Sequence, residues 1–559
     1  MTQASTAHPA GQAGSEHSDR DASAGGVPDV VRRRLAGVDA HLDGRSWLAT
    51  AVVVAIAAIL RLVNLAHPPG KVFDEVYYAR DAWGLINKGV EWSYQDDGPS
   101  YVVHPPLGKW LIGLGEWAFG YYDYDNERGV VVVEQVAGHL FTTAPEFAWR
   151  FSAAIVGTLS VLLLVRIGRR LFRSTVLGCA AGLLLALDGF HLVLSRTALL
   201  DIFLLFFVLA TFGALVLDRD ARRRRWAGAL ADGLDPGRPG RAGRPAGGWR
   251  NWPWWRLAAG VLFGCACAVK WSALYFLPAF VLLVVFWEVG ARRSAGVRRP
   301  WRDTLLDEVP WLVLAGLLMV VTYVATWSGW LLGDEGYYRV IDAQRWPNAR
   351  LSDTPVVGAL QNLVEYHRAA YGFHAQLDDT HKYQSWPWQW LLLGRPVAFY
   401  WSGDGACGAA SCASEVLLLG TPLLWWSFLP ALVALAWLGL ARRDWRAGAI
   451  LLCVAAGLLP WFWFAVAGGR TMFSFYAAPA LPFLVLAVTY VLGAIIGPPV
   501  SAAAAPEADQ DRRLVGGVIA GAYVVLVALC FAYFYPIFVG ETIPYDDWSN
   551  RMWLDGRWI

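Results

Sequence analysis

Long apolar runs constrain this chain more than any other feature, because they recur along it at the size of a membrane crossing. A helix needs roughly 20 mainly apolar residues to span the hydrocarbon core, and a continuous helix satisfies its own backbone there. Eleven such segments occur, at about 47–65, 147–165, 175–193, 197–217, 257–272, 273–290, 309–330, 416–440, 447–467, 472–497 and 514–535. The sequence therefore predicts an all-α polytopic membrane protein with about eleven transmembrane helices.

The composition agrees with this interpretation. Hydrophobic residues make up 56% of the chain, against roughly 45–50% in soluble domains. The 31 tryptophans suit rings that sit at the two membrane interfaces. The net charge of +2 points to no nucleic-acid partner.

Basic residues in the connecting segments predict the orientation. With eleven spans, five arginine clusters fall on the side of the N-terminus, which the distribution of basic residues assigns to the cytoplasm. The clusters are Arg166–Arg173, Arg222–Arg225, Arg292–Arg299, Arg442–Arg446 and Arg512–Arg513. This predicts a multi-pass plasma membrane protein with its long loops outside the cytoplasm.

The remaining segments follow from that topology. Residues 1–45 are polar and predict a disordered cytoplasmic tail, with no cleavable signal peptide. A transmembrane domain over 46–535 would carry outer loops at about 66–146 and 331–415, a cytoplasmic linker at 218–256 and an outer tail at 536–559. Short amphipathic stretches in both outer loops are expected to lie along the interface, as a surface enzyme requires.

Cys407 and Cys412 lie five positions apart in one polar loop. A small disulfide is plausible there if the loop faces an oxidising compartment. Two free thiols remain the alternative. No CxxC or His/Cys cluster suggests a structural metal.

Asp74 and Glu75 form an acidic pair near the membrane, flanked by apolar and aromatic residues. Sugar transfer needs a carboxylate that takes a proton from an attacking hydroxyl, and a second carboxylate can orient the first or a ligand. The structural alternative is a solvated acidic turn or a helix N-cap.

Arg61 and Arg150 lie at the outer ends of the first two spans. A guanidinium near hydrocarbon is costly and suggests a functional partner. A phosphate leaving group would suit either one, because arginine binds phosphate by forked hydrogen bonds. The alternative is that they snorkel to the headgroups.

Other polar residues have stronger structural alternatives. His104, in the segment HPPLGKW, could contact substrate but more simply holds its loop. Arg196 and Asp201 are expected to form an interfacial ion pair, and Lys270 has a similar alternative. No glycine-rich phosphate loop, Ser-His-Asp signature or HExxH motif appears, so use of ATP or a nucleotide sugar has no support.

An ordered set of motifs resembles the protein O-mannosyltransferases, glycosyltransferase family 39 of the GT-C class. They are VFDEVYYA, HPPLGKW, AWRFSAAIVGTL, LDGFHLVLSRTALLD and CAVKWSALYF, with weaker matches in KYQSWPWQW and FSFYAAPALPF. The resemblance implies a polyprenyl-phosphate mannose donor and Ser/Thr hydroxyls of secreted proteins as acceptors. It also implies a GT-C type fold embedded in membrane lipids.

By the same resemblance, Asp74 corresponds to the catalytic acidic residue and Glu75 to its partner. Arg150 corresponds to the phosphate-binding arginine, and Arg61 to another functional arginine. His104, Arg196, Asp201 and Lys270 match as possible substrate or structural residues.

The chain departs from eukaryotic members in two places. Val102 stands where they often have an aspartate, two residues before the histidine of HPP. The second outer loop is too short for the β-trefoil domain that they carry there. The chain therefore resembles the bacterial form.

The predicted reaction is an inverting transfer of mannose that requires no cofactor, although a divalent metal stays open. A GT-C enzyme with a lipid or polysaccharide acceptor is the alternative; a lipid-linked sugar flippase is a third hypothesis, weakened because no internal repeat is seen. The sequence leaves open whether the protein docks on the secretion channel.

Overall fold

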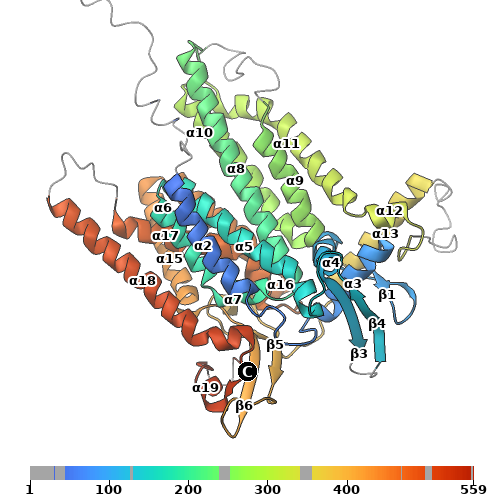
Figure 1. The fold of residues 1–559 in the computed structure, drawn as a ribbon. Helices are drawn as coiled ribbons and strands as arrows, with labels where there is room; N and C mark the ends of the chain where they lie inside the picture. The colour runs from blue at the N-terminus through green and yellow to red at the C-terminus, as the bar shows by residue number, and fades with distance from the viewer. Residues whose placement is uncertain are drawn as a thin grey trace, which may run out of the picture.

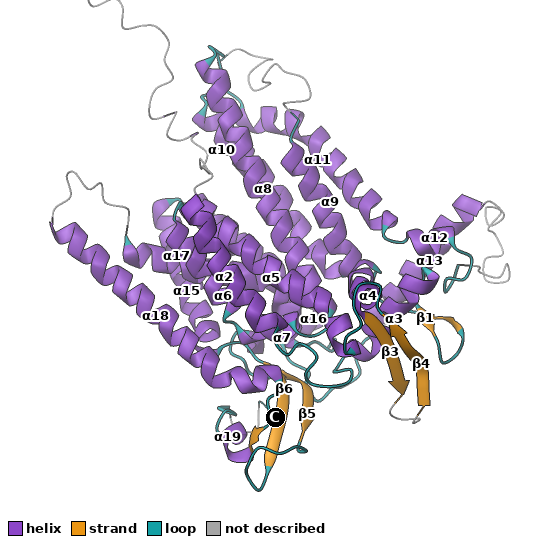
Figure 2. Ribbon diagram, viewed as in Figure 1, coloured by secondary structure: helices purple, strands orange, loops and turns teal. Residues whose placement is uncertain are grey.

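The computed structural model describes residues 31, 35, 44–125, 130–237, 252–339, 355–467, 469–497, 507–554 and 558. Most of the predicted N-terminal tail and part of the predicted linker lie outside these residues. The described part is mainly helical, with three small sheets at one end (Figures 1 and 2).

Long helices form the body of the molecule. They are α2 (Gly44–Leu62), α5 (Pro145–Phe172), α8 (Leu200–Ala231), α9 (Trp254–Val269), α10 (Phe276–Ser294), α11 (Pro300–Ala325), α15 (Pro422–Arg442), α16 (Trp445–Ala467), α17 (Leu481–Ile496) and α18 (Glu507–Val539). The remaining helices connect them or lie at their ends: α3 (Glu75–Lys88), α4 (Leu107–Phe119), α6 (Thr175–Ala186), α7 (Gly189–Ser195), α12 (Ser328–Leu332), α13 (Pro355–Ala375), α14 (Pro387–Trp390), α19 (Tyr545–Ser549), η2 (Trp271–Tyr275) and η3 (Ser474–Ala480).

Each of the eleven predicted spans falls on a helix, but fewer meet the requirements for a crossing. Within the described residues nine helices are long and apolar enough, or ten if α6 and α7, which are bent by 66°, form one span. The predicted span 257–272 corresponds to α9, which has only 16 residues. Among the described residues, nine to ten helices are thus candidate spans by length and composition, and α9 is a shorter apolar helix beside them.

Asp188 accounts for the break between α6 and α7. Its carboxylate accepts hydrogen bonds from the backbone of His191 at 3.0 Å, the backbone of Thr421 at 3.0 Å and the indole of Trp425 at 2.8 Å. A short acidic side chain that caps a new helix ends the preceding one. Hydropathy alone does not reveal this break.

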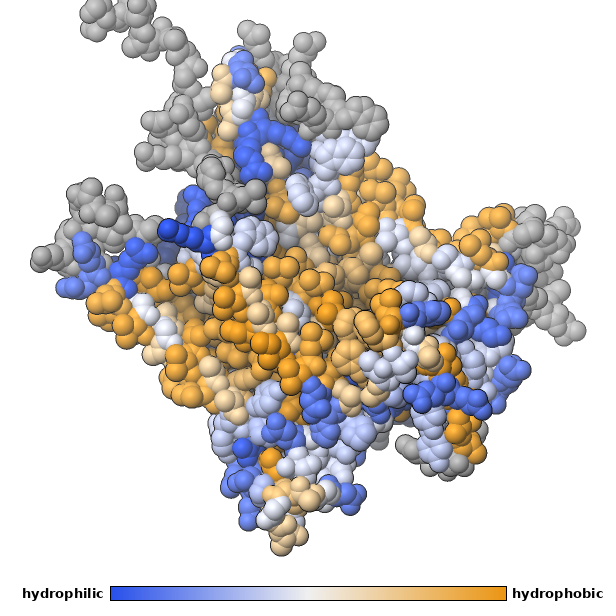
Figure 3. Space-filling view, viewed as in Figure 1, coloured by the Kyte–Doolittle hydropathy of each residue, from blue (hydrophilic) through white to orange (hydrophobic). Residues whose placement is uncertain are grey.

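Helix α11 buries polar side chains and exposes apolar ones, the reverse of a helix in a soluble protein and the pattern of a span that faces lipid. Its buried side chains are Thr304 and Glu308, whereas Val313, Leu317 and Val321 are exposed. Figure 3 shows a broad apolar band between two polar ends of the molecule. Because large exposed apolar areas are rare on soluble proteins, this band supports the multi-pass membrane fold.

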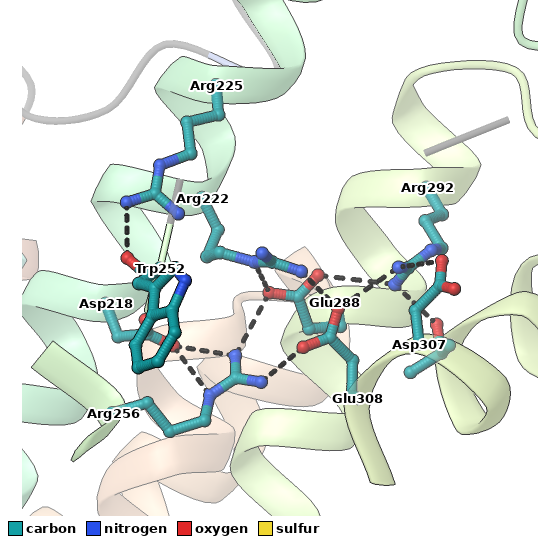
Figure 4. A network of polar contacts seen from close by, with 10 residues as sticks. Asp218, Arg222, Arg225, Trp252, Arg256, Glu288, Arg292, Asp307 and Glu308 are labelled. Atoms are coloured by element: carbon teal, nitrogen blue, oxygen red, sulfur yellow. Dashed lines mark hydrogen bonds and ion pairs between the residues drawn. The ribbon is translucent and has the colours of Figure 1, made fainter. Parts of the chain in front are cut away.

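One end of the bundle, called the basic end here, carries an ion-pair network (Figure 4). Arg256 of α9 pairs with Asp218 of α8 at 2.7 Å and also with Glu308 of α11. Arg292 of α10 pairs with Glu308 at 3.1 Å. Because α8 continues to Ala231, residues 218–231 are helical rather than part of the predicted linker.

The opposite end, called the loop end here, carries α3, α4, α13 and the sheets (Figure 1). The strands are β1 (Trp92–Ser93) with β2 (Gly98–Pro99), β3 (Gly120–Asp125) with β4 (Val130–Ala137), and β5 (Val397–Ser402), β6 (Cys412–Leu418) and β7 (Ile543–Pro544) in one antiparallel sheet. The expectation of an all-α fold missed them, because the strands are short. Cys407 and Cys412 are joined as a disulfide in the β5–β6 connection, which resolves the two alternatives.

Candidate active site

Asp74 is presented by a tight turn between α2 and α3. Phe73, the residue before it, has a left-handed backbone with φ of 47°, a costly conformation for a bulky side chain. The Phe73 ring stacks on Phe399 at 4.6 Å and meets the edge of Phe475 at 6.0 Å. Packing against two distant segments therefore holds the strained turn in place.

Asp74 occupies the N-cap position of α3, as the structural alternative expected, but its side chain makes no capping hydrogen bond. Burial raises the pKa of the Asp74 carboxyl from 3.8 to about 6, while Lys270 opposes and Asp201 adds to that shift. A carboxyl with a pKa near the working pH is suited to general base catalysis. The side chain is thus left available for chemistry.

Lys270 and Asp201 form a buried ion pair beside Asp74. The ammonium of Lys270 lies 2.7 Å from the Asp201 carboxylate. The predicted pair of Arg196 with Asp201 is therefore wrong, because the start of α8 faces the loop after α9. One cation and one further anion therefore act electrostatically on the Asp74 carboxyl.

Arg196 instead fastens α7 to the end of α2. Its guanidinium donates to the carbonyls of Leu60 at 3.2 Å, Val63 at 2.8 Å and Asn64 at 2.7 Å. A cation at the C-terminus of a helix is favourable, because it meets carbonyls that lack helical partners. Arg196 has a structural role in the described geometry.

The Glu75 side chain is buried in the protein and does not join Asp74 at the candidate site. Its carboxylate receives two hydrogen bonds from Arg150, at 2.9 and 2.8 Å, and both side chains are fully buried. The backbone amides of Val72 and Ala198 donate to it at 2.9 Å each. Glu75 therefore positions the turn that carries Asp74.

Arg150 uses every N–H donor on protein acceptors. Besides Glu75 it binds the carbonyls of Leu65 at 3.3 Å, Pro68 at 2.8 Å and Gly70 at 2.9 Å. In this arrangement the guanidinium holds the loop ahead of Asp74. Its direct contact with a donor phosphate stays a prediction, which would require one of these bonds to be exchanged.

Arg61 lies in a second buried cluster. It donates to the carbonyl of Ala57 at 3.1 Å and contacts His191 Nδ1 at 2.8 Å. Its Nε and the Nε2 of His191 are buried without a hydrogen-bond partner in the described residues. The groups that act on the charge of Asp74 are Lys270 and Asp201, so Arg61 is not brought into that set, and its phosphate role also stays a prediction.

His104 lies in an aromatic layer at the site. Its ring centroid is 6.3 Å from Tyr78 and 5.2 Å from His374 of α13. Burial and the nearby charge of Lys270 hold the pKa of His104 well below its usual range. A neutral His104 can exchange hydrogen bonds with a sugar or hydroxyl, as one of the two alternatives supposed.

Helix α13 brings residues to the site that sequence reasoning missed. His374 Nε2 lies 3.1 Å from the carbonyl of Val103, and Arg470 lies 3.5 Å from His374 Nδ1. Tyr366 of α13 accepts from and donates to the backbone of Val102, at 3.0 and 2.8 Å. No motif marked these residues.

Tyr476 was also missed, although it stands in the quoted segment FSFYAAPALPF. Its phenol lies within the electrostatic reach of Asp74, Asp201 and Arg470. Among the described residues no group of three or more His, Cys, Asp and Glu is placed to hold a metal ion.

Comparison with known proteins identifies the family of this chain. The family model described as dolichyl-phosphate-mannose-protein mannosyltransferase matches residues 51–237. A second model, described as the C-terminal four TMM region of protein-O-mannosyltransferase, matches residues 359–558. Together the two models cover the turn of Asp74 and the segments of Phe399 and Phe475 that pack on it, whereas Lys270 lies between the two matched ranges.

Curated bacterial proteins match over almost their whole length. The polyprenol-phosphate-mannose–protein mannosyltransferase of Mycolicibacterium smegmatis is 38% identical over 525 residues, which cover 91% of this chain and 92% of that protein. The corresponding protein of Corynebacterium glutamicum is 31% identical, with 92% and 93% covered.

The fold also matches a solved structure. A chain of the Saccharomyces cerevisiae protein O-mannosyltransferase Pmt1–Pmt2 complex bound to the sugar donor superimposes with a TM-score of 0.66. The match covers 94% of each chain at 15% sequence identity, so it concerns the fold, and the predicted GT-C type architecture is confirmed. On the two family models and the full-length bacterial relatives, the chain belongs to the protein O-mannosyltransferase family, glycosyltransferase family 39.

Proposed function

We propose that the chain transfers mannose from a polyprenyl-phosphate donor to Ser or Thr hydroxyls of proteins. The names of the bacterial relatives support the donor and the protein acceptor. The observation that carries the proposal is Asp74, whose carboxyl makes no cap bond, has a pKa raised to about 6 and lies at a pair of opposite charges.

The transfer step is a single displacement. The hydroxyl oxygen attacks the anomeric carbon as the bond from that carbon to the phosphate oxygen breaks. Asp74 takes the hydroxyl proton, and polyprenyl phosphate leaves with the electron pair. Attack opposite the leaving group inverts the anomeric centre, and no covalent enzyme intermediate is needed.

Charge at the phosphate must be neutralised as it leaves. Lys270 is the cation that acts on Asp74, and a lysine can bind phosphate as a point charge. Arg470 contacts the far side of the His374 ring. Its Nε is buried and has no hydrogen-bond partner among the described residues. Arg150 and Arg61 hold the scaffold around these groups and reach phosphate directly only after rearrangement. The step is drawn without a metal.

The loop end is proposed to face the outside of the plasma membrane. Basic side chains gather at the opposite end, which favours the cytoplasm, and the Cys407–Cys412 disulfide at the loop end suits an oxidising compartment. Secreted proteins would then meet Asp74 as acceptors during or after export, and the secretion channel is the partner that could deliver them.

The test is a transfer assay with purified protein in detergent, a polyprenyl-phosphate mannose donor and a Ser/Thr-rich peptide. Asp74→Asn and Arg150→Ala should both lose transfer, and near wild-type rates in both would overturn the assignment. A peptide with Ala in place of Ser and Thr is the negative control, and a lipid glycan and a polysaccharide serve as alternative acceptors. Transfer to one of these but not to the Ser/Thr peptide would reassign the acceptor class.

A further inference from the structure

A charged pocket lies at the basic end of the bundle, away from Asp74. It has a volume of about 240 Å³ and is lined by residues from the end of α5, from α8, and from Asp444 and the start of α16. Four arginines and two aspartates line it: Arg170, Arg173, Arg219, Arg446, Asp220 and Asp444. Four positive charges against two negative ones leave a formal surplus of two positive charges.

The ion pairs in the pocket divide the two carboxylates unequally among the arginines. Arg446 is bound to Asp444, with Nε 2.9 Å from Oδ1, and the hydroxyl of Tyr490 adds a bond to the same carboxylate at 3.0 Å. Arg170 and Arg219 instead share one carboxylate, that of Asp220, at 2.9 and 3.0 Å. Two guanidinium groups therefore converge on a single anion.

Arg219 is held in place by its neighbours, but one of its hydrogen-bond donors has no partner among the described residues. Its guanidinium stacks on the ring of Trp445, 3.5 Å from the centroid, and its side chain is 7% exposed. Its Nε is buried and has no hydrogen-bond partner in the described residues. A buried donor without an acceptor is costly, and it points to an acceptor that the described residues do not supply.

The geometry points to a binding site for a phosphate anion in this pocket, distinct from the donor site at Asp74. Forked guanidinium donors match the oxygens of phosphate. The pocket lies between the end of α5, α8 and the start of α16, and all three helices are candidate membrane spans. Basic pockets of this kind suit the headgroups of anionic phospholipids, although a soluble phosphate offers the same chemistry.

Two arginines allow a matched test. Arg173 and Arg443 both follow a helix at the basic end in left-handed backbone, with φ of 53° and 49°, and glycine tolerates that conformation at either position. Arg173 lines the pocket, whereas Arg443 is not among its lining residues. Arg173→Gly thus removes a pocket charge, and Arg443→Gly removes a comparable charge outside it.

The experiment titrates the purified full-length chain with phosphatidylglycerol, with zwitterionic phosphatidylcholine and with inorganic phosphate at constant ionic strength, and counts bound molecules by native mass spectrometry. Phosphatidylglycerol should bind the wild type and Arg443→Gly alike, and Arg173→Gly about fivefold more weakly, since one basic residue near a membrane surface contributes about 1 kcal/mol. Arg219→Gln should weaken binding further; if that variant does not fold, Arg173→Gly still decides.

The arms separate the two sources of phosphate. Binding of phosphatidylglycerol without binding of inorganic phosphate identifies a lipid headgroup, and binding of inorganic phosphate that Arg173→Gly weakens identifies a soluble anion. Equal affinity of the wild type, Arg173→Gly and Arg443→Gly for every probe would overturn the site. Mannose transfer by Arg173→Gly in detergent without added anion is expected to equal that of the wild type.

Discussion

Arg150 and Glu75 form a two-pronged ion pair that is closed to solvent, with N–O distances of 2.9 and 2.8 Å. The pair joins α5 to the first residue of α3, directly after Asp74. Because Arg150 also holds three carbonyls of the preceding loop, one guanidinium sets the position of the candidate base. Of the two neighbouring acids, Glu75 is therefore bound to Arg150, and Asp74 stays the candidate base.

Breaking the pair is expected to destabilise the protein. Arg150→Ala leaves the buried Glu75 carboxylate without its cation, a change that costs about 3–5 kcal/mol in comparable sites. A fall in melting temperature should be seen with a thiol-reactive dye, because Cys267 and Cys453 are buried and free in the folded chain.

Arg368 provides the matched control for that change. It is 65% exposed and lies 3.6 Å from Glu365, and a surface pair contributes roughly 0–1 kcal/mol. Arg368→Ala should therefore leave the melting temperature nearly unchanged. A similar shift in both variants would remove the special role of the Arg150–Glu75 pair.

Replacing Asp74 by Asn is expected to remove transfer while the fold persists. The amide cannot accept the hydroxyl proton, so the rate should fall by about 10²–10⁴-fold, the usual contribution of a general base. Asp97→Asn, at an exposed aspartate of the loop end, is the control and should keep the wild-type rate. An inactive Asp74→Asn with a lowered melting temperature would instead indicate a structural role.

The raised pKa of Asp74, about 6, predicts the pH profile of kcat/KM. Below pH 6 the carboxyl is protonated and cannot act as a base, so the rate should rise about tenfold per pH unit and level off above that pKa. The profile is measured with the peptide acceptor from pH 4.5 to 8 in steps of about half a unit. A flat profile across pH 6 would contradict the assignment of the base.

The same pKa affects stability with a defined sign. Between 3.8, the ordinary pKa of aspartate, and about 6, the folded state binds more protons at Asp74 than the unfolded state does. Its contribution to the free energy of unfolding therefore falls as pH rises through this window. Melting curves of Asp74→Asn should lack this contribution, and identical pH trends in both proteins would contradict the raised pKa.

The Cys407–Cys412 bond offers a test of sidedness. In intact cells a membrane-impermeant maleimide should label the chain only after a reductant is added, because reduction frees the thiol of the half-buried Cys407 on the proposed outer side. The double variant Cys407→Ser/Cys412→Ser should show no such increase. Labelling that requires permeabilised cells would place the loop end in the cytoplasm and reverse the proposed orientation.

Local pattern was sufficient for much of this molecule. Apolar runs of membrane-spanning length located a helix for each predicted span, because hydrocarbon burial acts on contiguous residues. The ordered motifs predicted the family correctly, and the neighbouring acids Asp74 and Glu75 predicted the position of the candidate site. The break between α6 and α7 at Asp188 was not predicted, because a capping side chain changes the hydropathy of the segment little while it redirects the backbone.

Which side chains form ion pairs and hydrogen bonds depended on how distant segments of the chain pack against each other. Arg150 binds Glu75 across 75 positions of sequence, Lys270 takes Asp201 in place of Arg196, and α13 brings His374 to Val103 across 271 positions. Local periodicity states which residues share a face, but each ion pair depends on packing between elements far apart in the chain. The roles within the site therefore come from three-dimensional contact, whereas its existence could be predicted from the residues alone.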